Sequence, residues 1–189
     1  STLNNLAAAL SGDGRLKEAR PYLEQSLELL RQFPSESELA LRAVINLGRL
    51  EEEAGNRKQA RRLFESALDS EWFSGAPAAI RLDVLYELAG FYQSTGKSKL
   101  AAPLLEEAES LAAASGDTLL LAVALNRLAV FYHSVNNPWD AEPLFRKELE
   151  LRKQLCGLDH AEVAACCNNL ATLHASLTDW EGAARNYRR

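Results

Sequence analysis

Five cysteines and histidines lie within residues 156–174: Cys156, His160, Cys166, Cys167 and His174. Thiols and imidazoles are common protein ligands of zinc, so a metal centre is the first chemistry to consider. The spacing matches no zinc pattern, however, and the adjacent Cys166 and Cys167 point to different faces of a helix. We therefore expect no metal ion and no cofactor.

The other reactive residues do not form a catalytic arrangement. The sequence contains no Ser-His-Asp order, no phosphate-binding loop and no convergent pair of carboxylates. We expect His160 to lie in a turn, and Trp72, Phe73 and Trp139 to make linker and packing contacts. The sequence therefore indicates a protein that is not an enzyme.

The composition favours a helical chain. Its 189 residues, 47% apolar and 25% charged, are ordinary for one globular domain. Gly (10) and Pro (6) are few, whereas the residues that lose little side-chain freedom in a helix are abundant. The net charge of −5 argues against nucleic-acid binding, and the basic segment 56–62 is expected to face solvent at the start of a helix.

The small number of cysteines and the lack of long apolar runs indicate the cellular location. Only 3 cysteines occur, too few for a disulfide framework, which favours a reducing, cytoplasmic location. No apolar run approaches the roughly 18 to 20 residues of a membrane span, so we expect no membrane partner. The chain begins without Met inside a helical pattern, and we expect it to be part of a longer protein.

A repeat of about 41 residues positions the side chains. Anchoring leucines recur 41, 41, 40 and 42 residues apart, at Leu6, Leu47, Leu88, Leu128 and Leu170. Each is followed by a small residue, at Ala7, Gly48, Ala89, Ala129 and Ala171. Eight residues after each leucine comes a turn position, at Gly14, Gly55, Gly96, Asn136 and Thr178. Because Gly and Asn accept the left-handed conformation that ends helices, these positions predict turns.

A second pattern follows each turn. It contains an alanine, at Ala19, Ala60, Ala101, Ala141 and Ala183, and then a large apolar residue, at Leu23, Phe64, Leu105, Phe145 and Tyr187. A short residue comes three positions later in the first three copies, whereas the fourth has Glu148. These spacings place apolar stripes on two helices that pack as a hairpin, with small residues where the helices approach closely. One hairpin cannot cover its own stripe, so neighbouring hairpins must stack.

This set of positions resembles the tetratricopeptide repeat. The period exceeds the usual 34 residues, and residues 124–187 are similar to the kinesin-light-chain subclass. In that subclass the connection between repeats commonly reads Leu-Gly-x-Asp-His-Pro-Asp-Val-Ala, and residues 155–164 are similar except that Ala161 replaces the Pro. Armadillo and HEAT repeats have comparable periods but lack the alanine at this spacing.

The resemblance implies an all-α, right-handed α-solenoid (superhelix) of antiparallel helix hairpins. We expect a single array over residues 1–189, with repeats at about 1–40, 41–81, 82–121, 122–163 and a truncated 164–189. In such an array the first helices of the repeats line a concave groove. The expected groove residues are Asn4, Asn5, Arg42, Asn46, Arg49, Tyr86, Gln93, Asn126, Arg127, His133, Asn168 and Asn169.

Six of these residues are asparagines, which are unfavourable in the middle of a helix because the amide competes with the backbone. Amides can bind the main chain of an extended peptide, and the resemblance implies that use. The alternative is that they bond one first helix to its neighbour or are tolerated on an exposed face. Arg42, Arg49 and Arg127 could form a strip for an acidic peptide, and Tyr86 an aromatic wall.

The sequence thus predicts a scaffold whose groove binds a partner peptide or helix. Two alternatives remain. Terminal repeats with exposed apolar faces could join copies of the chain into a homo-oligomer. The segment could also be a regulatory part of a signalling protein or enzyme, whose chemistry would then lie elsewhere.

Overall fold

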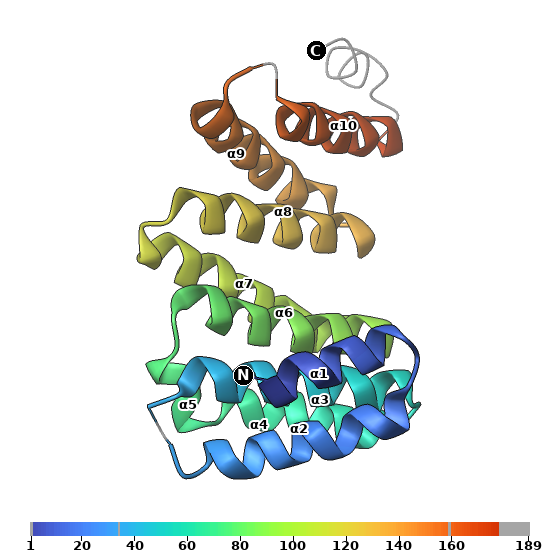
Figure 1. Cartoon of the computed structure of the whole chain (residues 1–189). Coiled ribbons are helices and arrows are strands. Elements are labelled where there is room, and N and C mark those ends of the chain that lie inside the picture. Colours follow the sequence, from blue (N-terminus) through green and yellow to red (C-terminus); the bar gives the residue numbers. More distant parts are fainter. Residues whose placement is uncertain (1, 34, 159, 178–189) are drawn as a thin grey trace. The chain divides into compact units, whose positions relative to one another are not determined.

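The computed structural model describes residues 2–33, 35–158 and 160–177, and the regular structure of this part of the chain is helical (Figure 1). The helices are α1 (Thr2–Gly12), α2 (Leu16–Leu30), α3 (Ser37–Glu53), α4 (Arg57–Leu68), α5 (Glu71–Gly75), α6 (Ala78–Ser94), α7 (Ser98–Ser115), α8 (Thr118–Ser134), α9 (Pro138–Cys156) and α10 (Ala161–Ser176). They form two compact units, unit 1 (Ser1–Lys97) and unit 2 (Ser98–Arg189).

Consecutive helices pack as hairpins within each unit, which confirms the predicted all-α fold. In unit 1, α1 packs on α2 and α3 on α4, while α6 packs on both α3 and α4. In unit 2, α8 packs on α7 and α9, and α10 packs on α9. Helices α3, α6, α8 and α10 begin at residues 37, 78, 118 and 161, three or four residues before the expected repeat starts. The second helix expected in the fifth repeat, with Thr178, Ala183 and Tyr187, lies outside the described residues.

The predicted turns are confirmed by their backbone conformation. Gly14, Gly55, Gly96 and Asn136 have φ angles of 74°, 80°, 73° and 58°. These values lie in the left-handed region, which Gly enters freely and Asn tolerates better than most residues. Each turn therefore reverses the chain between the two helices of a hairpin.

The repeated small and apolar residues form the core, as their spacing predicts. Ala19, Ala60, Ala101 and Ala141 are all 0% exposed, and the large residue four positions later is buried in each of these repeats. The anchoring leucines of the second to fifth repeats are at most 6% exposed. Leu6 is different, with 45% of its surface exposed, because no other helix in the described part of the chain covers that side of α1.

A recurring polar contact joins each first helix to the second helix of the repeat before it. The contact is made by the residue four positions after the anchoring leucine. In unit 1, Glu51 Oε1 lies 2.7 Å from Arg20 Nη2, and the Tyr92 hydroxyl donates a 2.7 Å hydrogen bond to Glu65. In unit 2, the Tyr132 hydroxyl donates a 2.6 Å bond to Glu106, and His174 Nε2 lies 3.4 Å from Glu142 Oε1.

The two tyrosine contacts change the acidity of the phenols. Burial, followed by the bond to Glu65, raises the pKa of Tyr92 to about 12. The bond to Glu106, followed by burial, raises the pKa of Tyr132 to about 12. Both phenols therefore stay protonated, and able to donate, throughout the neutral range.

The segment between α4 and α6 contains the short helix α5, which the sequence pattern does not predict. Phe73 of α5 is buried, and the guanidinium of Arg81 lies over its ring at 5.0 Å from the centroid. The packing expected for Phe73 is therefore confirmed. The same expectation for Trp139 is wrong, since this side chain is 77% exposed near the start of α9.

Candidate protein-binding surface

The first helices of unit 1 expose one polar side each. Helices α1, α3 and α6 lie side by side, with α3 in contact with both others. On α3 the exposed positions recur at i, i+7 and i+11, a spacing that keeps side chains on one side of a helix. We call this surface the first-helix face; its exposed residues are Asn5, Arg42, Arg49, Glu53, Asp83, Gly90 and Gln93.

An ion pair bridges two helices of this face. The Arg49 guanidinium donates to both carboxylate oxygens of Glu87 on α6, with Nε–Oε2 at 2.9 Å and Nη2–Oε1 at 2.5 Å. This bond raises the pKa of Arg49. Arg42 is also paired, through Nε at 3.1 Å from Glu38 Oε1. Two of the three arginines predicted to attract an acidic peptide, Arg42 and Arg49, therefore already have carboxylate partners within unit 1.

The predicted asparagines have different environments. The Asn46 amide donates a 3.0 Å bond to Asn4 Oδ1, which joins α3 to α1 below the surface, where Asn4 is 8% exposed. Asn5 is exposed on α1. This arrangement corresponds to the alternative in which an amide bonds one first helix to its neighbour.

The two remaining predicted residues of unit 1 also differ in exposure. Tyr86 is 8% exposed, so the aromatic wall expected from its ring does not line the surface. Its position, two residues before the anchoring leucine, is also buried at Ile45. Gln93, in contrast, lies exposed near the end of α6, where it can contact a ligand.

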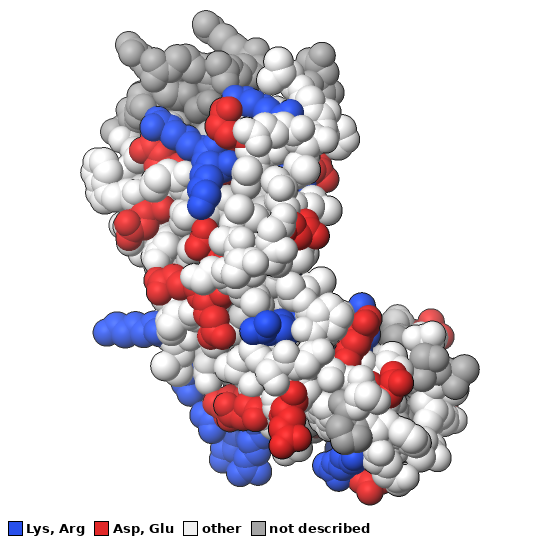
Figure 2. Space-filling model, turned by 90° about the vertical axis from the view of Figure 1, so that its left-hand side faces the viewer, with Lys and Arg blue, Asp and Glu red and all other residues white. Residues whose placement is uncertain are grey.

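Unit 2 has its own exposed first-helix residues. Arg127 and Val130 are exposed on α8, and His133 is half-buried there. On α10, Asn168 is exposed and Asn169 is half-buried. Figure 2 shows acidic and basic side chains interspersed over most of the face that it draws, with one group of basic side chains near its lower edge.

Asn126, the remaining predicted asparagine, takes part in a buried polar network in unit 2. Asn126 Nδ2 donates a 2.9 Å bond to Glu148 Oε2, and Glu148 is 3% exposed. Arg152, 9% exposed, has its Nε at 3.8 Å from Glu148 and its Nη1 at 2.5 Å from Glu162 on α10. The network therefore joins α8, α9 and α10.

Burial controls the acidity of this network. Desolvation raises the pKa of Glu148, against the bonds from Asn126 and the Cys166 thiol and the charge of Arg152, which lower it. Burial, followed by the charge of Glu148, raises the pKa of Cys166 to about 12. The Cys166 thiol is thus protonated and buried at neutral pH, which makes it unreactive.

Sequence reasoning recognised Glu148 only as an exception to the small residues at its position. Two signals could have identified the network. Arg152 follows Glu148 by four residues, the spacing of neighbours on one side of a helix, and Asn126 is a polar residue at a largely buried position of the repeat.

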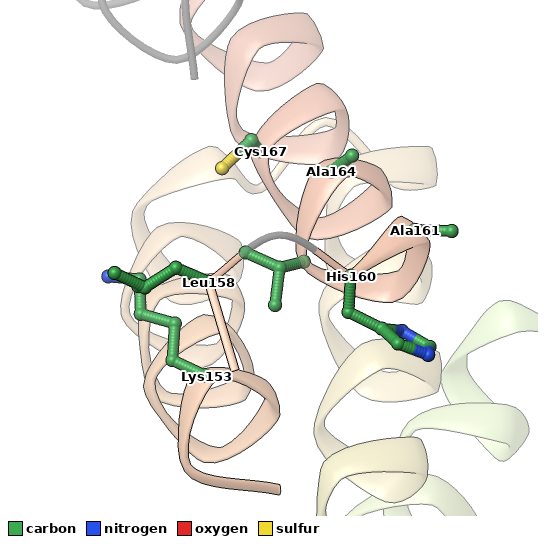
Figure 3. Close-up of a pocket in the computed structure, with 7 residues that line it drawn as sticks. Lys153, Leu158, His160, Ala161, Ala164 and Cys167 are labelled. Atoms are coloured by element: carbon green, nitrogen blue, oxygen red, sulfur yellow. The ribbon is translucent and has the colours of Figure 1, made fainter. Parts of the chain in front are cut away.

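The connection between α9 and α10 contains a hollow of about 720 Å³ (Figure 3). Its lining includes Lys153, Leu158, His160, Ala164 and Cys167. The His160 imidazole points away from the Cys167 thiol in Figure 3, so these two side chains do not form a nucleophile–base pair. His160 instead caps α10, where its Nδ1 accepts a 3.2 Å bond from the Glu162 backbone N–H.

The structure brings together three side chains that sequence reasoning did not combine. One possible ligand atom each of Cys156, His160 and Glu162 lies within 4.8 Å of the others. All three residues already have partners: Glu162 binds Arg152, His160 Nδ1 accepts a backbone bond, and the Cys156 thiol donates a 3.0 Å bond to the Arg152 carbonyl. A metal cation here would have to compete with the Arg152 guanidinium for the same carboxylate.

The packing defines a class of protein: a helical repeat array of hairpins that meet at alanines and reverse at left-handed turns. The sequence pattern of the tetratricopeptide repeat matches residues 1–70 and 81–154. The chain belongs to the tetratricopeptide repeat family. This family generally serves as a protein–protein interaction module and is typically non-catalytic.

Solved structures share the fold. A putative kinesin light chain from Podospora anserina with nearly identical TPR-like repeats has a TM-score of 0.80 and 20% identity, covering 99% of this chain and 90% of that one. BtubC (BKLC) from P. vanneervenii has a TM-score of 0.77 and 23% identity, covering 92% and 71%. YrrB, described as a TPR protein with an unusual peptide-binding site, has a TM-score of 0.60 and 21% identity, covering 97% and 80%.

The predicted similarity to kinesin light chains is thus confirmed at the level of the fold. A comparison with curated protein sequences gave no match. Within the described residues, no helix is both long enough and apolar enough to cross a membrane.

Proposed function

We propose that the first-helix face of unit 1 binds an extended or helical segment of a partner protein. The observation that supports this is the contrast between the two sides of these helices. The repeated apolar positions of α3 and α6 are buried, whereas Arg42, Gly90 and Gln93 are exposed and not needed for packing. Such a surface offers charged and amide groups to a ligand without loss of fold.

Two features of this face suit an acidic peptide. The pair of Arg42 with Glu38 is about half exposed on both sides, and exposed pairs of this kind contribute only about 0–1 kcal/mol. A carboxylate of the partner can therefore replace Glu38 at little cost. Gly90 has no atom within 4 Å of the place where a side chain would begin, so a peptide backbone can approach α6 there.

The asparagines divide into two kinds for this purpose. Asn126 bonds to buried Glu148, so its replacement is expected to lower stability and cannot report on binding alone. Asn168 is exposed on α10, so replacing it by alanine tests whether unit 2 contributes to binding without a loss of stability. YrrB, which shares the fold, provides a precedent for peptide binding but does not identify the residues.

A peptide selected from a phage-displayed library against the 189-residue chain provides the ligand for the test. Replacing Arg42 and Gln93 by alanine is expected to raise its Kd about tenfold, or about 1.4 kcal/mol, because both side chains offer donors on the exposed face. The midpoint of thermal unfolding should stay the same. Fluorescence anisotropy measures the Kd, and circular dichroism measures the unfolding.

A matched control is available on α2 and at its C-terminal end. Arg31 forms an exposed pair with Glu28 at 2.8 Å, and Gln25 is exposed, so the variant with both replaced by alanine removes the same groups elsewhere. This control should bind like the parent chain. If both variants raised the Kd equally, the first-helix face would be excluded as the binding surface.

Self-association through α1 is the second candidate, and the exposure of Leu6 favours it. The four equivalent leucines are at most 6% exposed, so Leu6 presents an apolar group that a further helix would normally cover. Burying a leucine contributes about 1.5–3 kcal/mol. The variant Leu6→Gln should lower the dimer association constant at least tenfold in sedimentation equilibrium, whereas Leu29→Gln, exposed to 47% on α2, should not. A parent chain that stays monomeric at millimolar concentration would exclude this candidate.

A further inference from the structure

A hollow of about 440 Å³ in unit 1 is surrounded by positive charge. It lies between α4 and the C-terminal end of α6, and its lining includes Arg57, Lys58, Arg61, Arg62 and Lys97. Phe91, which is buried, and Thr95 complete the lining. We call this feature the α4–α6 basic pocket. It holds 5 of the 21 lysines and arginines of a chain whose net charge is −5, so the overall composition does not account for it.

The arrangement of these charges is unfavourable for the helix itself. The pairs 57/61 and 58/62 are four residues apart, so like charges are neighbours, and each such pair costs about 0.2–0.5 kcal/mol. The first turn of α4 has no acidic residue, although the N-terminal end of a helix favours negative charge. Asn56, at the N-cap, makes no side-chain bond to the helix, because its amide donates to Glu51.

Little within the described part of the chain compensates these charges. Arg61 lies 3.6 Å from Glu65, whose Oε1 also accepts the hydroxyl bond of Tyr92, and the buried Nε of Arg61 has no hydrogen-bond partner there. The side chains of Arg57, Lys58, Arg62 and Lys97 form no ion pair or hydrogen bond with a described residue. The pocket therefore has an excess of donors and of positive charge.

We propose that the α4–α6 basic pocket binds a phosphoryl group. A phosphoryl group carries up to two negative charges and three acceptor oxygens, which match a set of arginine forks and lysine ammonium groups better than a single carboxylate does. The N-terminal end of α4 adds the positive end of the helix dipole, which also favours an anion. The hollow is large enough for a phosphoryl group together with part of the molecule that carries it.

This site is separate from the proposed peptide surface, because it is built on the second helix α4 and the end of α6. The phosphoryl group has two possible sources, a phosphorylated side chain of a partner protein or a free oligophosphate. The probes are therefore inorganic pyrophosphate and the peptide Gly-Gly-phosphoserine-Gly-Gly, with the same peptide lacking the phosphate as the reference.

Isothermal titration calorimetry with the whole chain tests the proposal. We expect pyrophosphate or the phosphoserine peptide to bind, and the unphosphorylated peptide not to bind. The double variant Lys58→Glu/Arg62→Glu should raise the Kd at least tenfold. Both side chains are exposed, so the fold should persist, as circular dichroism would verify. The affinity should also fall as the salt concentration rises, because exposed charges are screened.

The control Lys17→Glu/Arg31→Glu changes the net charge by the same amount on α2 and at its C-terminal end. It should leave the Kd within twofold of the parent value. Tighter binding of the phosphoserine peptide than of pyrophosphate would assign the site to phosphorylated proteins, and the reverse order to free oligophosphates. The proposal is overturned if neither probe binds, if the unphosphorylated peptide binds as tightly as the phosphorylated one, or if the two double variants weaken binding equally.

Discussion

Replacing Arg152 by alanine is expected to lower the free energy of unfolding by about 3–5 kcal/mol. The guanidinium of Arg152 lies beside buried Glu148 and binds Glu162, so its removal leaves a buried carboxylate without its cation. Urea denaturation followed by circular dichroism measures this loss. The pair of Arg146, which is 66% exposed, with the half-buried Glu142 is the control, and Arg146→Ala should cost at most about 1 kcal/mol because this guanidinium remains largely in water.

The loss should also depend on pH. Burial raises the pKa of Glu148 in the folded chain above its unfolded value, so the stability this group contributes is full below the unfolded pKa and declines as the pH rises through the folded pKa. Removing the positive charge of Arg152 raises the folded pKa of Glu148 further. The difference between parent and Arg152→Ala should therefore be larger at pH 7.5 than at pH 5. A loss that is the same at both pH values would show that Glu148 is not its source.

Adding one methyl group at Gly48 is expected to destabilise the chain by about 1–3 kcal/mol, although alanine favours helices. A Cβ at this position would lie 2.5 Å from Cε1, 2.8 Å from Cζ and 2.9 Å from Cδ1 of Phe64. The Phe64 ring is completely buried and packs against Phe91, so it has little room to move. The strain should exceed the gain in helix propensity of about 1 kcal/mol.

Gly90 on the next first helix of unit 1 is the matched control. It is also inside a helix, but it is exposed and has no atom within 4 Å of an added Cβ. Gly90→Ala should therefore stabilise the chain by about 0.5–1 kcal/mol. Denaturation curves of the two variants should shift in opposite directions, and a shift in the same direction would refute the contact between Gly48 and Phe64.

The spacing of leucines, alanines and turn residues was sufficient to predict the helices and hairpins. A left-handed turn at Asn136 follows from local chemistry, and the burial of Ala60 follows from the helical period. These features depend on residues close in the sequence, which is why one sequence reveals them. Helix α5 was missed because its five residues are too few to show a period.

The use of individual polar residues could not be predicted in the same way. Asn126 and Asn168 occupy equivalent positions, yet one bonds to Glu148 and the other is exposed. The difference depends on a residue 22 positions away that breaks the repeat pattern. Tyr86 is buried for a similar reason, because its exposure depends on how neighbouring helices pack and not on its own spacing.

The polar contacts between successive repeats differ in kind along the chain. Glu51 binds a guanidinium, Tyr92 and Tyr132 donate to carboxylates, and His174 lies beside one. If α3 followed α9 directly, Glu51 would face Glu142, which stands at the repeat position of Arg20, and two carboxylates would meet in place of an ion pair. The repeats are consequently not interchangeable parts, and their order is encoded in the contacts between neighbours. Arrays of like repeats are prone to pair out of order as they fold, and a junction chemistry that changes along the chain opposes that error.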